Sequence, residues 1–353
     1  MSHAILARMT EENPDHEALK KAGKILREGG LVAFPTETVY GLGGDALNPE
    51  SSKKIYAAKG RPSDNPLIIH IADRESLLPL VQEVPAAAER LMDAYWPGPL
   101  TMIFRKSEIV PYETTGGLDT VAVRFPNNRI ACEMIREAGG YVAAPSANTS
   151  GRPSPTLASH VEEDLGDKID MILDGGQVEI GLESTIVDFT EETPVILRPG
   201  FLNQQMLEEV LAEVRMDPGL ESENVHVRPK APGMRYRHYA PKAKLAIVQG
   251  KQENVFARIR QLVDEGLEQG AKIGVICTEE SRAEYPKGEV RCIGSRADDR
   301  TIARHLFEIL RDFDSADVDR IYTESFDTPH MGQAIMNRLI KAAGHEIIDA
   351  DTE

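Results

Sequence analysis

Two polar side chains, Ser146 and Asn148, stand two positions apart directly after the apolar run at 141–144. In an extended segment alternate side chains point to the same side, so this hydroxyl and this amide can face one point. Such groups donate hydrogen bonds to phosphate or carboxylate oxygens. The alternative is a loop without function, because the Pro, Ser, Asn and Gly residues of 145–156 are also typical turn residues.

Basic residues occur at or beside the ends of other predicted strands. Lys59 and Arg61 flank Gly60, which permits a tight turn that brings both side chains near one point. Arg124 alternates with apolar residues in "VAVRF", where a guanidinium is costly unless a carboxylate, a phosphate or a carbonyl answers it. The alternative for Arg124 is a side chain that reaches out from an edge strand. Arg198 ends another apolar run.

Fixed cations and neutral donors, without a GxSxG motif or the GK[ST] of a phosphate loop, predict a site that positions a polyanion and supports transfer at phosphorus. His70 ends "PLIIH" and either hydrogen-bonds a ligand or is a satisfied core histidine. Trp96 is expected to have a packing role, and the alternative is that it forms a wall of the crevice. The glycine-rich run "YGLGGDA" at 40–46 is expected to form a tight turn.

The elements that must position these groups alternate along the first two hundred residues. Short apolar strands are separated by amphipathic helices, but some strand pairs lack an intervening helix, which favours a mixed sheet. The expected strands are 31–34, 66–71, 100–104, 121–125, 141–144, 171–174, 184–189 and 194–198. This pattern predicts a sheet-rich α/β domain with a mixed sheet over the first two hundred residues.

The pattern changes after residue 200. A helix is expected at 204–214 and a linker after it, so that 201–241 joins two domains. The linker holds the cluster "RYRHY" at 235–239, which suggests that it docks rather than swings freely. Residues 242–349 alternate strands with helices at 252–269, 301–313 and 331–343, which predicts a smaller doubly wound α/β domain. No dinucleotide-binding fingerprint follows its first strand.

The composition restricts the classes of partner. The chain has a net charge of −17, and its first two hundred residues hold 19 Lys and Arg against 30 Asp and Glu. This argues against stable nucleic-acid binding, which needs clustered basic residues. Three separated cysteines without a CxxC pair make a disulfide framework or a structural zinc site unexpected. No leader and no apolar stretch of about 18 residues is seen, so we expect a soluble cytoplasmic protein without membrane contact.

Taken together, seven motifs in order resemble the YrdC-like family of threonylcarbamoyl-AMP synthases. They are "FPTETVYGLGGDA", "KGRPSDNPLIIH", "WPGPLT", "VAVRFP", "APSANTSGRPSPT", "STIVD" and "ILRPG". The resemblance covers about residues 13–200, and "APGMRYRHYAP" followed by a small domain looks like the two-domain members, whose second domain is Rossmann-like. The implied fold is a YrdC-like sheet with a basic crevice.

The resemblance implies that L-threonine, bicarbonate or CO₂, and ATP give L-threonylcarbamoyladenylate and pyrophosphate, with Mg²⁺ accompanying ATP. It implies that a tRNA threonylcarbamoyl transferase complex then modifies the adenine beside the anticodon. The implied catalytic tetrad is Lys59, Arg61, Ser146 and Asn148. The implied threonine-binding residues are Thr38, His70, Arg124, Ala144 and Ser184, and the implied ATP-binding residues are Arg61, Asn65, Thr120, Ser146, Ser154, Arg198 and Tyr239. No protein metal site and no obvious general base is expected.

Three other interpretations stay open. The first is an RNA-binding module of YrdC-like fold, which would need a basic first domain. The second is a carbamoyl-transfer enzyme of hydrogenase maturation, which would need CxxC pairs ahead of the domain. The third makes the C-terminal domain a separate nucleotide sensor, although it lacks a phosphate loop.

Overall fold

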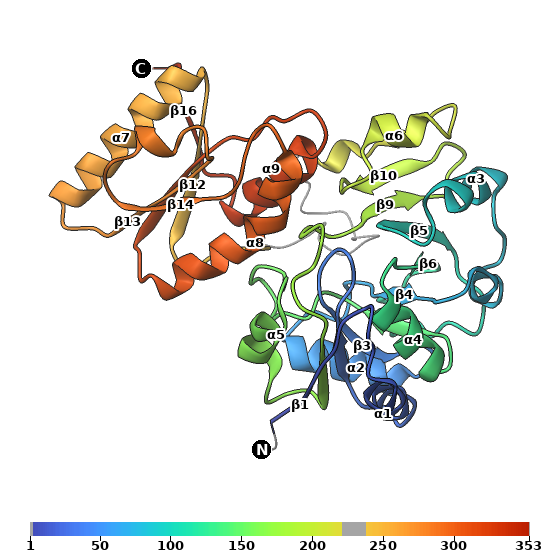
Figure 1. Cartoon of the computed structure of the whole chain (residues 1–353). Helices are drawn as coiled ribbons and strands as arrows, with labels where there is room; N and C mark the ends of the chain where they lie inside the picture. The colour runs from blue at the N-terminus through green and yellow to red at the C-terminus, as the bar shows by residue number, and fades with distance from the viewer. Residues whose placement is uncertain (1–2, 221–237, 353) are drawn as a thin grey trace. The chain divides into compact units, whose positions relative to one another are not determined.

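The structure is a computed structural model that describes residues 3–220 and 238–352, and these residues form two compact units (Figure 1). The first unit holds the described residues up to Ser150 together with 154–220. The second holds Gly151–Pro153 and 238–352. Residues 201–220, expected to begin the linker, thus group with the first unit.

One mixed sheet dominates the described part of the first unit. Its eleven strands lie in the order β1-β8-β2-β3-β7-β4-β6-β5-β9-β10-β11, with parallel and antiparallel neighbours, as the sequence predicts. The strands are β1 Ile5–Arg8, β2 Val32–Phe34, β3 Gly41–Asp45, β4 Ile68–His70, β5 Leu100–Arg105, β6 Thr120–Arg124, β7 Val142–Ala144, β8 Met171–Asp174, β9 Thr185–Asp188, β10 Val195–Arg198 and β11 Arg215–Met216. The edge strand β1 lies before residue 13, ahead of the segment that resembles the family.

Helices begin where short polar side chains can cap them. Asp15 accepts a hydrogen bond from the Ala18 amide, and Asn128 accepts one from the Ala131 amide. The helices of the first unit are α1 His16–Arg27, α2 Pro49–Lys59, α3 Ala86–Tyr95, α4 Arg129–Glu137, α5 Ala158–Leu165 and α6 Gln204–Glu208, with 3₁₀ turns η1 Arg74–Leu80 and η2 Pro218–Leu220.

Two expectations about local structure are wrong. The helix expected at 204–214 ends at Glu208, because the chain leaves it to pair Arg215 and Met216 with β10. The glycine-rich run expected to turn forms strand β3 between β2 and β7. A Cβ on Gly43 would lie 2.9 Å from the Cγ1 of Val142, so the missing side chains make room for those of the neighbouring strands.

On the face of the sheet that carries Arg124, the two halves of the sheet belong to different apolar clusters. Helices α1 and α4 pack together and share one apolar core with β2, β7 and β8. Farther along the sheet, β4, β6, β5, β9 and β10 contribute one residue each to a small apolar cluster. Its members are Ile68, Ala122, Ile103, Ile186 and Leu197. His70 and Arg124 lie on the same face, two positions after Ile68 and Ala122 of this cluster.

The second unit contains a five-stranded parallel sheet in the order β14-β13-β15-β12-β16. The strands are β12 Lys244–Gln249, β13 Ile273–Cys277, β14 Glu289–Cys292, β15 Arg320–Glu324 and β16 Ile347–Asp349, and the helices are α7 Gln252–Glu268, α8 Asp299–Ser315 and α9 Gly332–Ala342, with the 3₁₀ turn η3 Arg282–Glu284. The predicted smaller doubly wound domain is confirmed.

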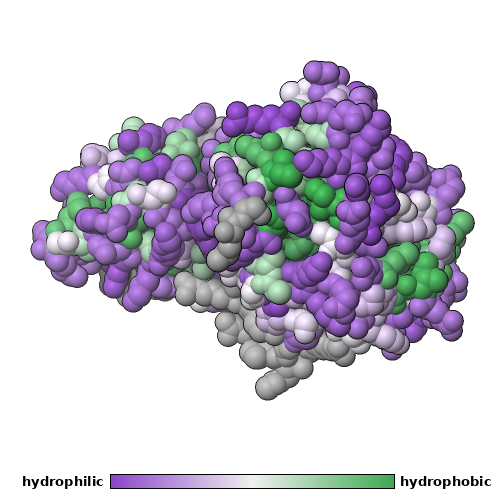
Figure 2. All heavy atoms as spheres, turned by 90° about the horizontal axis from the view of Figure 1, so that it is seen from below, coloured by the Kyte–Doolittle hydropathy of each residue, from purple (hydrophilic) through white to green (hydrophobic). Residues whose placement is uncertain are grey.

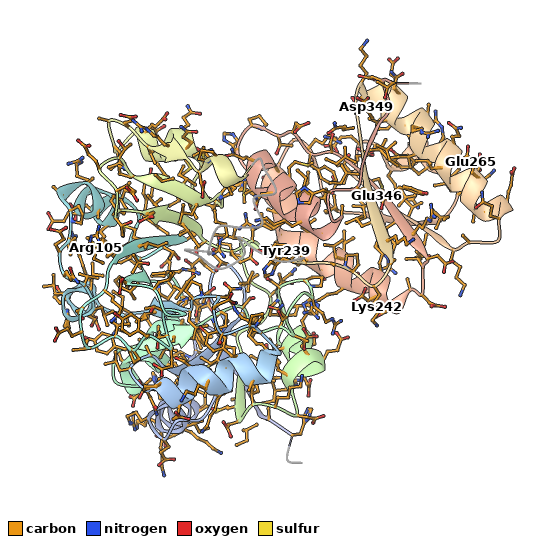
Figure 3. The ribbon with its side chains drawn as sticks, turned by 180° about the vertical axis from the view of Figure 1, so that it is seen from behind. Arg105, Tyr239, Lys242, Glu265, Glu346 and Asp349 are labelled. Carbon is orange, nitrogen blue, oxygen red and sulfur yellow. The ribbon has the colours of Figure 1, made fainter. Side chains whose placement is uncertain are left out.

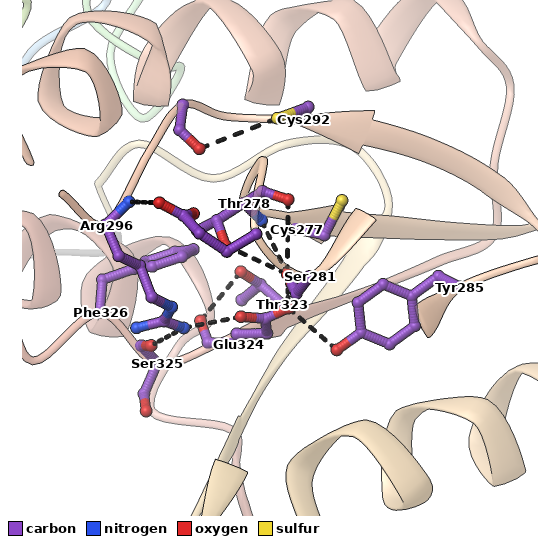
Figure 4. A network of polar contacts seen from close by, with 12 residues as sticks. Cys277, Thr278, Ser281, Tyr285, Cys292, Arg296, Thr323, Glu324, Ser325 and Phe326 are labelled. Atoms are coloured by element: carbon purple, nitrogen blue, oxygen red, sulfur yellow. Dashed lines mark hydrogen bonds and ion pairs between the residues drawn. The ribbon is translucent and has the colours of Figure 1, made fainter. Parts of the chain in front are cut away.

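A buried carboxylate lies at the carboxyl end of strand β15 in this second sheet (Figure 4). Glu324, at the end of β15, accepts hydrogen bonds from the hydroxyls of Ser281 at 2.5 Å and Tyr285 at 2.9 Å. The Nη2 of Arg296 lies 2.6 Å from its other oxygen. The charge of Glu324 is therefore balanced by Arg296 and two hydroxyl donors within the second unit. We interpret this network as structural.

The exposed face drawn in Figure 2 is mostly hydrophilic, with scattered apolar patches. This agrees with a charged fraction of 27%. Among the described residues no helix has the length and apolar character needed to cross a membrane.

Candidate active site

Three members of the predicted tetrad meet in the first unit. Helix α2 ends at Lys59, and Gly60 follows with a φ of 62°, which turns the chain sharply. The Nζ of Lys59 donates to the carbonyls of Ser146 and Asn148, both at 2.5 Å. The hydroxyl of Ser146 donates to the side-chain carbonyl of Asn148 at 2.6 Å. The loop that follows strand β7 therefore brings the hydroxyl, the amide and a buried cation together.

The fourth member, Arg61, lies beside a predicted nucleotide-binding residue. Its Nη2 donates to the carbonyls of Pro66 at 3.1 Å and Asn65 at 3.4 Å. Asn65 is buried, and its side-chain oxygen has no hydrogen-bond partner among the described residues. Arg61 and Asn65 thus lie in one turn of the chain.

Arg124 does not lie on an edge strand, because β6 is paired with β4 on one side and β5 on the other. It is 4% exposed. Its Nη2 lies 2.7 Å from the Oε1 of Glu37, and its Nη1 donates to the Thr38 hydroxyl at 2.7 Å. A carboxylate therefore answers the buried guanidinium, which was one of the three possibilities that the sequence left open.

Glu37 was missed by sequence reasoning, which named its neighbour Thr38 as a candidate. A signal was present, since Glu37 is the single charged residue of 29–44. A buried Arg also demands a partner of opposite charge. Neither signal alone joins loop 35–40 to β6.

A second set of hydrogen bonds connects predicted threonine-binding and nucleotide-binding residues. Arg198 donates through Nε to the Ser184 carbonyl at 3.0 Å and through Nη2 to the Ser184 hydroxyl at 3.2 Å. That hydroxyl lies 2.7 Å from the Thr101 hydroxyl, and Thr101 is opposite Arg124 in the sheet register. The two cations thus lie on strands β6 and β10 of one sheet, and Thr101 of β5 and Ser184, just before β9, lie between them.

A β-bulge directs Arg198 toward this set. Ile196 pairs with Val187 and Arg198 with Ile186, so Leu197 is an extra residue on β10. Two residues on one strand then oppose one on the other, which re-aims the side chain that follows. The sequence "VILR" shows no sign of this irregularity.

His70 lies opposite Arg124 in the sheet register and is 5% exposed. Burial and the nearby guanidinium of Arg124 lower the pKa of His70 to about 3. Its Nδ1 lies 3.0 Å from the Ile68 carbonyl, and its ring meets that of Phe34 edge-on. His70 is therefore a neutral, internally bonded histidine beside Arg124.

The other predicted residues of the first unit lie on neighbouring elements. Thr120 begins β6 and shares a face with Arg124, because the two are four positions apart on one strand. Ala144 ends β7 opposite Ile68. Ser154 is buried, and its hydroxyl donates to the Oε1 of Glu183 at 2.6 Å.

Tyr239, the predicted nucleotide contact from the linker, groups with the second unit (Figure 3). It has a φ of 63°, and its ring stacks on Phe307 with 4.9 Å between centroids. Residues 235–237 of the cluster that was expected to dock lie outside the described residues, so the docking of the linker stays a prediction. Predicted packing of Trp96 agrees with its ring contact to Phe125.

Two of the three cysteine thiols, those of Cys132 and Cys277, are held in the protonated form. Burial raises the pKa of Cys132 to about 11 and that of Cys277 to about 12. A thiol with so high a pKa holds its proton at neutral pH. Within residues 3–220 and 238–352, no three His, Cys, Asp or Glu side chains group as a metal site would require.

The comparisons with known proteins agree with this architecture. A family model described as "Telomere recombination" matches residues 24–200, and one described as the C-terminal domain of threonylcarbamoyl-AMP synthase matches residues 202–344. The threonylcarbamoyl-AMP synthase of Pyrococcus abyssi is 49% identical over 330 residues, which cover 94% of this chain and 95% of the relative. The chain belongs to the threonylcarbamoyl-AMP synthase family.

A second family member, from Bacillus subtilis, is 47% identical over 331 residues and covers 94% of both chains. Among solved structures, Sua5 of P. abyssi complexed with L-threonine matches with a TM-score of 0.92 and 47% identity over 99% of each chain. The predicted family and the two-domain fold are therefore confirmed. The roles of individual site residues stay predictions.

Proposed function

We propose that this chain forms L-threonylcarbamoyladenylate from L-threonine, bicarbonate or CO₂, and ATP, with release of pyrophosphate. The names of its full-length relatives support this activity, and a threonine complex of one similar structure supports an amino-acid site. The observation that carries the proposal is the placement of Arg124 and Arg198, two buried cations on one sheet, joined through Thr101 and Ser184. One cation suits a carboxylate and the other a phosphate.

The chemistry has two bond-forming steps. The amine of threonine, in its deprotonated neutral form, attacks the carbon of CO₂ and releases a proton to give a carbamate, or it attacks bicarbonate and gives the same carbamate with loss of water. A carbamate oxygen then attacks the α-phosphorus of ATP, the bond from that phosphorus to the bridging oxygen breaks, and pyrophosphate leaves. Both steps need reactants held in line more than they need a protein nucleophile.

The side chains divide this work by charge. Arg124 pairs with the threonine carboxylate, while His70, Thr38, Ala144 and Ser184 shape the amino-acid end. The negative charge that develops on the phosphates is balanced by Lys59, Arg61 and Arg198. Neutral contacts to the nucleotide come from Asn65, Thr120, Ser146, Asn148 and Ser154, and Tyr239 is a further proposed contact.

Mg²⁺ fits this site as a companion of ATP rather than as a resident ion. It prefers oxygen ligands and is commonly held by one or two carboxylates and substrate phosphates. Ser154 and Glu183 supply oxygens of that kind at the nucleotide end. The ion would neutralise phosphate charge, as the three basic side chains do.

The product is an activated adenylate, so we propose that a tRNA threonylcarbamoyl transferase complex consumes it in the cytoplasm. The test of the activity mixes purified protein, Mg-ATP and labelled bicarbonate, with and without threonine. We expect labelled AMP-linked product and pyrophosphate only when threonine is present. Pyrophosphate release that does not depend on threonine would contradict the proposal.

A further inference from the structure

Glu37 is a buried carboxylate whose hydrogen-bonding capacity is not filled by the described residues around it. It is 6% exposed, and its Oε1 makes an ion-pair contact of 2.7 Å with the Nη2 of Arg124. Neither of its oxygens accepts an aligned hydrogen bond from the described residues, and that Nη2 has no aligned acceptor. Buried polar groups are nearly always hydrogen-bonded in folded proteins. The two charges balance each other, but both carboxylate oxygens and that guanidinium nitrogen keep hydrogen-bonding capacity that the described residues do not fill, which points to a ligand.

Loop 35–40 holds Glu37 in place through its backbone. The Thr36 hydroxyl accepts from the amides of Thr38 and Val39 and donates to the Val39 carbonyl. The carbonyl of Glu37 accepts from the Ile180 amide at 2.9 Å. The carboxylate is thus positioned before any substrate binds, and it does not have to be ordered by one.

The Glu37–Arg124 pair carries no net charge. A simple carboxylic acid would bring one uncompensated negative charge beside the Glu37 carboxylate, and in a buried site that repulsion is large. An α-amino acid instead carries its ammonium and its carboxylate on one carbon, so adjacent charges of opposite sign can face the two members of the pair. The geometry favours a zwitterion over an anion.

We propose that Glu37 and Arg124 together recognise the zwitterion of the amino-acid substrate, with Arg124 binding the α-carboxylate and Glu37 binding the α-ammonium group. The inference rests on the proposed function and deepens it. It adds Glu37 as a substrate-binding residue and states how the site rejects acids that lack an amino group.

The alternative is that Glu37 acts only through Arg124, by holding the guanidinium in position. Both roles predict weaker binding of threonine when Glu37 is replaced. They differ for 3-hydroxybutanoate, which is threonine without its amino group. If Glu37 only positions Arg124, Glu37→Gln weakens both ligands by the same factor. If Glu37 binds the ammonium, Glu37→Gln weakens threonine alone.

The experiment titrates L-threonine, 3-hydroxybutanoate and 1-aminopropan-2-ol, which lacks the carboxylate, into the full-length protein by calorimetry. For Glu37→Gln we expect threonine binding to weaken about 10- to 100-fold, as for loss of a hydrogen bond to a charged group. We expect 3-hydroxybutanoate to bind as tightly as before or more tightly. Glu37→Asp keeps the charge and is expected to retain most of the preference for threonine over 3-hydroxybutanoate.

Asp93→Asn is the matched control, because it removes a carboxylate from an exposed ion pair with Arg74. We expect it to change none of the three affinities. Equal weakening of threonine and 3-hydroxybutanoate in Glu37→Gln, or no weakening of threonine, overturns the inference.

The wild-type protein provides a test that does not depend on the folding of a variant. We expect 3-hydroxybutanoate to bind at least about 10-fold more weakly than threonine, because it has no ammonium group to pair with the Glu37 carboxylate. Equal affinity of the two ligands overturns the inference while leaving the proposed function intact. A wild-type protein that binds no threonine and releases no pyrophosphate contradicts the proposed function itself.

Discussion

Lys59 is a buried cation that holds two loop carbonyls, and this arrangement makes a clear prediction about turnover. We expect Lys59→Ala and Arg61→Ala to lower the rate of threonine-dependent pyrophosphate release about 100-fold or more, because each removes a fixed positive charge from the phosphates. The measurement is the initial rate of pyrophosphate release at saturating ATP and threonine. Circular dichroism at the same temperature checks that the variants are folded.

Lys53→Ala is the control for these variants, since Lys53 lies on the same helix but pairs with Glu50 in solvent. We expect its rate to equal that of the wild type. A folded Lys59→Ala or Arg61→Ala protein with a near-normal rate would refute the assignment of the tetrad.

His70 leads to a prediction about pH. Its pKa in the folded chain is about 3, below the ordinary value of 6.5. Between these values the unfolded chain binds a proton that the folded chain does not, so the stabilisation is complete above about pH 6.5 and is lost as the pH falls. We expect the free energy of unfolding to fall by up to about 1.4 kcal/mol per pH unit from this group.

The measurement is urea unfolding between about pH 7 and pH 5 for the wild type and for His70→Gln. The variant lacks the titrating group, so we expect its free energy of unfolding to depend less steeply on pH. Identical slopes for the two proteins would show that His70 is not held neutral by the fold.

At the scale of residues, the sequence predicts a side chain's role where the need is local. Ser146 and Asn148 follow one strand, so their meeting depends on a short segment only. The position of Arg124 among apolar residues of a strand indicates that its guanidinium needs a partner. The identity of that partner depends on how loop 35–40 crosses the sheet. Glu37 could therefore not be assigned from the sequence pattern.

At the scale of elements, strand β3 depends on the absence of side chains. We expect Gly43→Ala to lower the free energy of unfolding by about 1–3 kcal/mol, because the added Cβ would meet Val142, Phe34 and the backbone oxygen of Val32 within 3.2 Å. The measurement is the urea midpoint together with the m-value.

Gly44→Ala is the matched comparison on the same strand. Its Cβ would meet the terminal methyl of Ile55 at 3.0 Å, and this end of a flexible side chain can move. We expect a smaller loss of stability than for Gly43→Ala. The reverse order would contradict the packing described for the two faces of β3.

Element types follow from the sequence wherever periodicity and local packing agree. The helices α1, α2, α7, α8 and α9 lie where apolar residues recur at three and four positions. The prediction of a helix at 204–214 was wrong because the pairing of 215–216 with β10 outweighs helical periodicity. The prediction of a turn in the glycine-rich run was wrong because it used only the local preference of glycine for turns, whereas 41–45 form a strand. The bulge in β10 likewise arises from pairing with β9.

At the scale of the whole molecule, the end of the first unit lies beyond residue 200. Leu202, Leu207, Leu211 and Val214 are buried in the main core of that unit. We expect the fragment 1–220 to unfold at a higher urea concentration than the fragment 1–200, because each buried side chain of this kind contributes about 1.5–3 kcal/mol. Urea unfolding of the two fragments, followed by circular dichroism, is the measurement.

We expect both fragments to release pyrophosphate slowly even where they are folded. Gly151–Pro153, in the middle of the loop that carries Ser146 and Ser154, group with the second unit, where Arg311 donates to the Pro153 carbonyl at 2.6 Å. Without those partners the loop loses its anchor. Full activity in the fragment 1–220 would remove any role for the second unit in turnover.

The burial of Lys59 also allows the state of the site to be measured without any substrate. An amine that donates to two carbonyls and is 2% exposed reacts slowly with acylating reagents, whereas the exposed amine of Lys53 reacts fast. The ratio of label on these two lysines, read by mass spectrometry, would report whether the loop carbonyls are in place in any preparation of the protein.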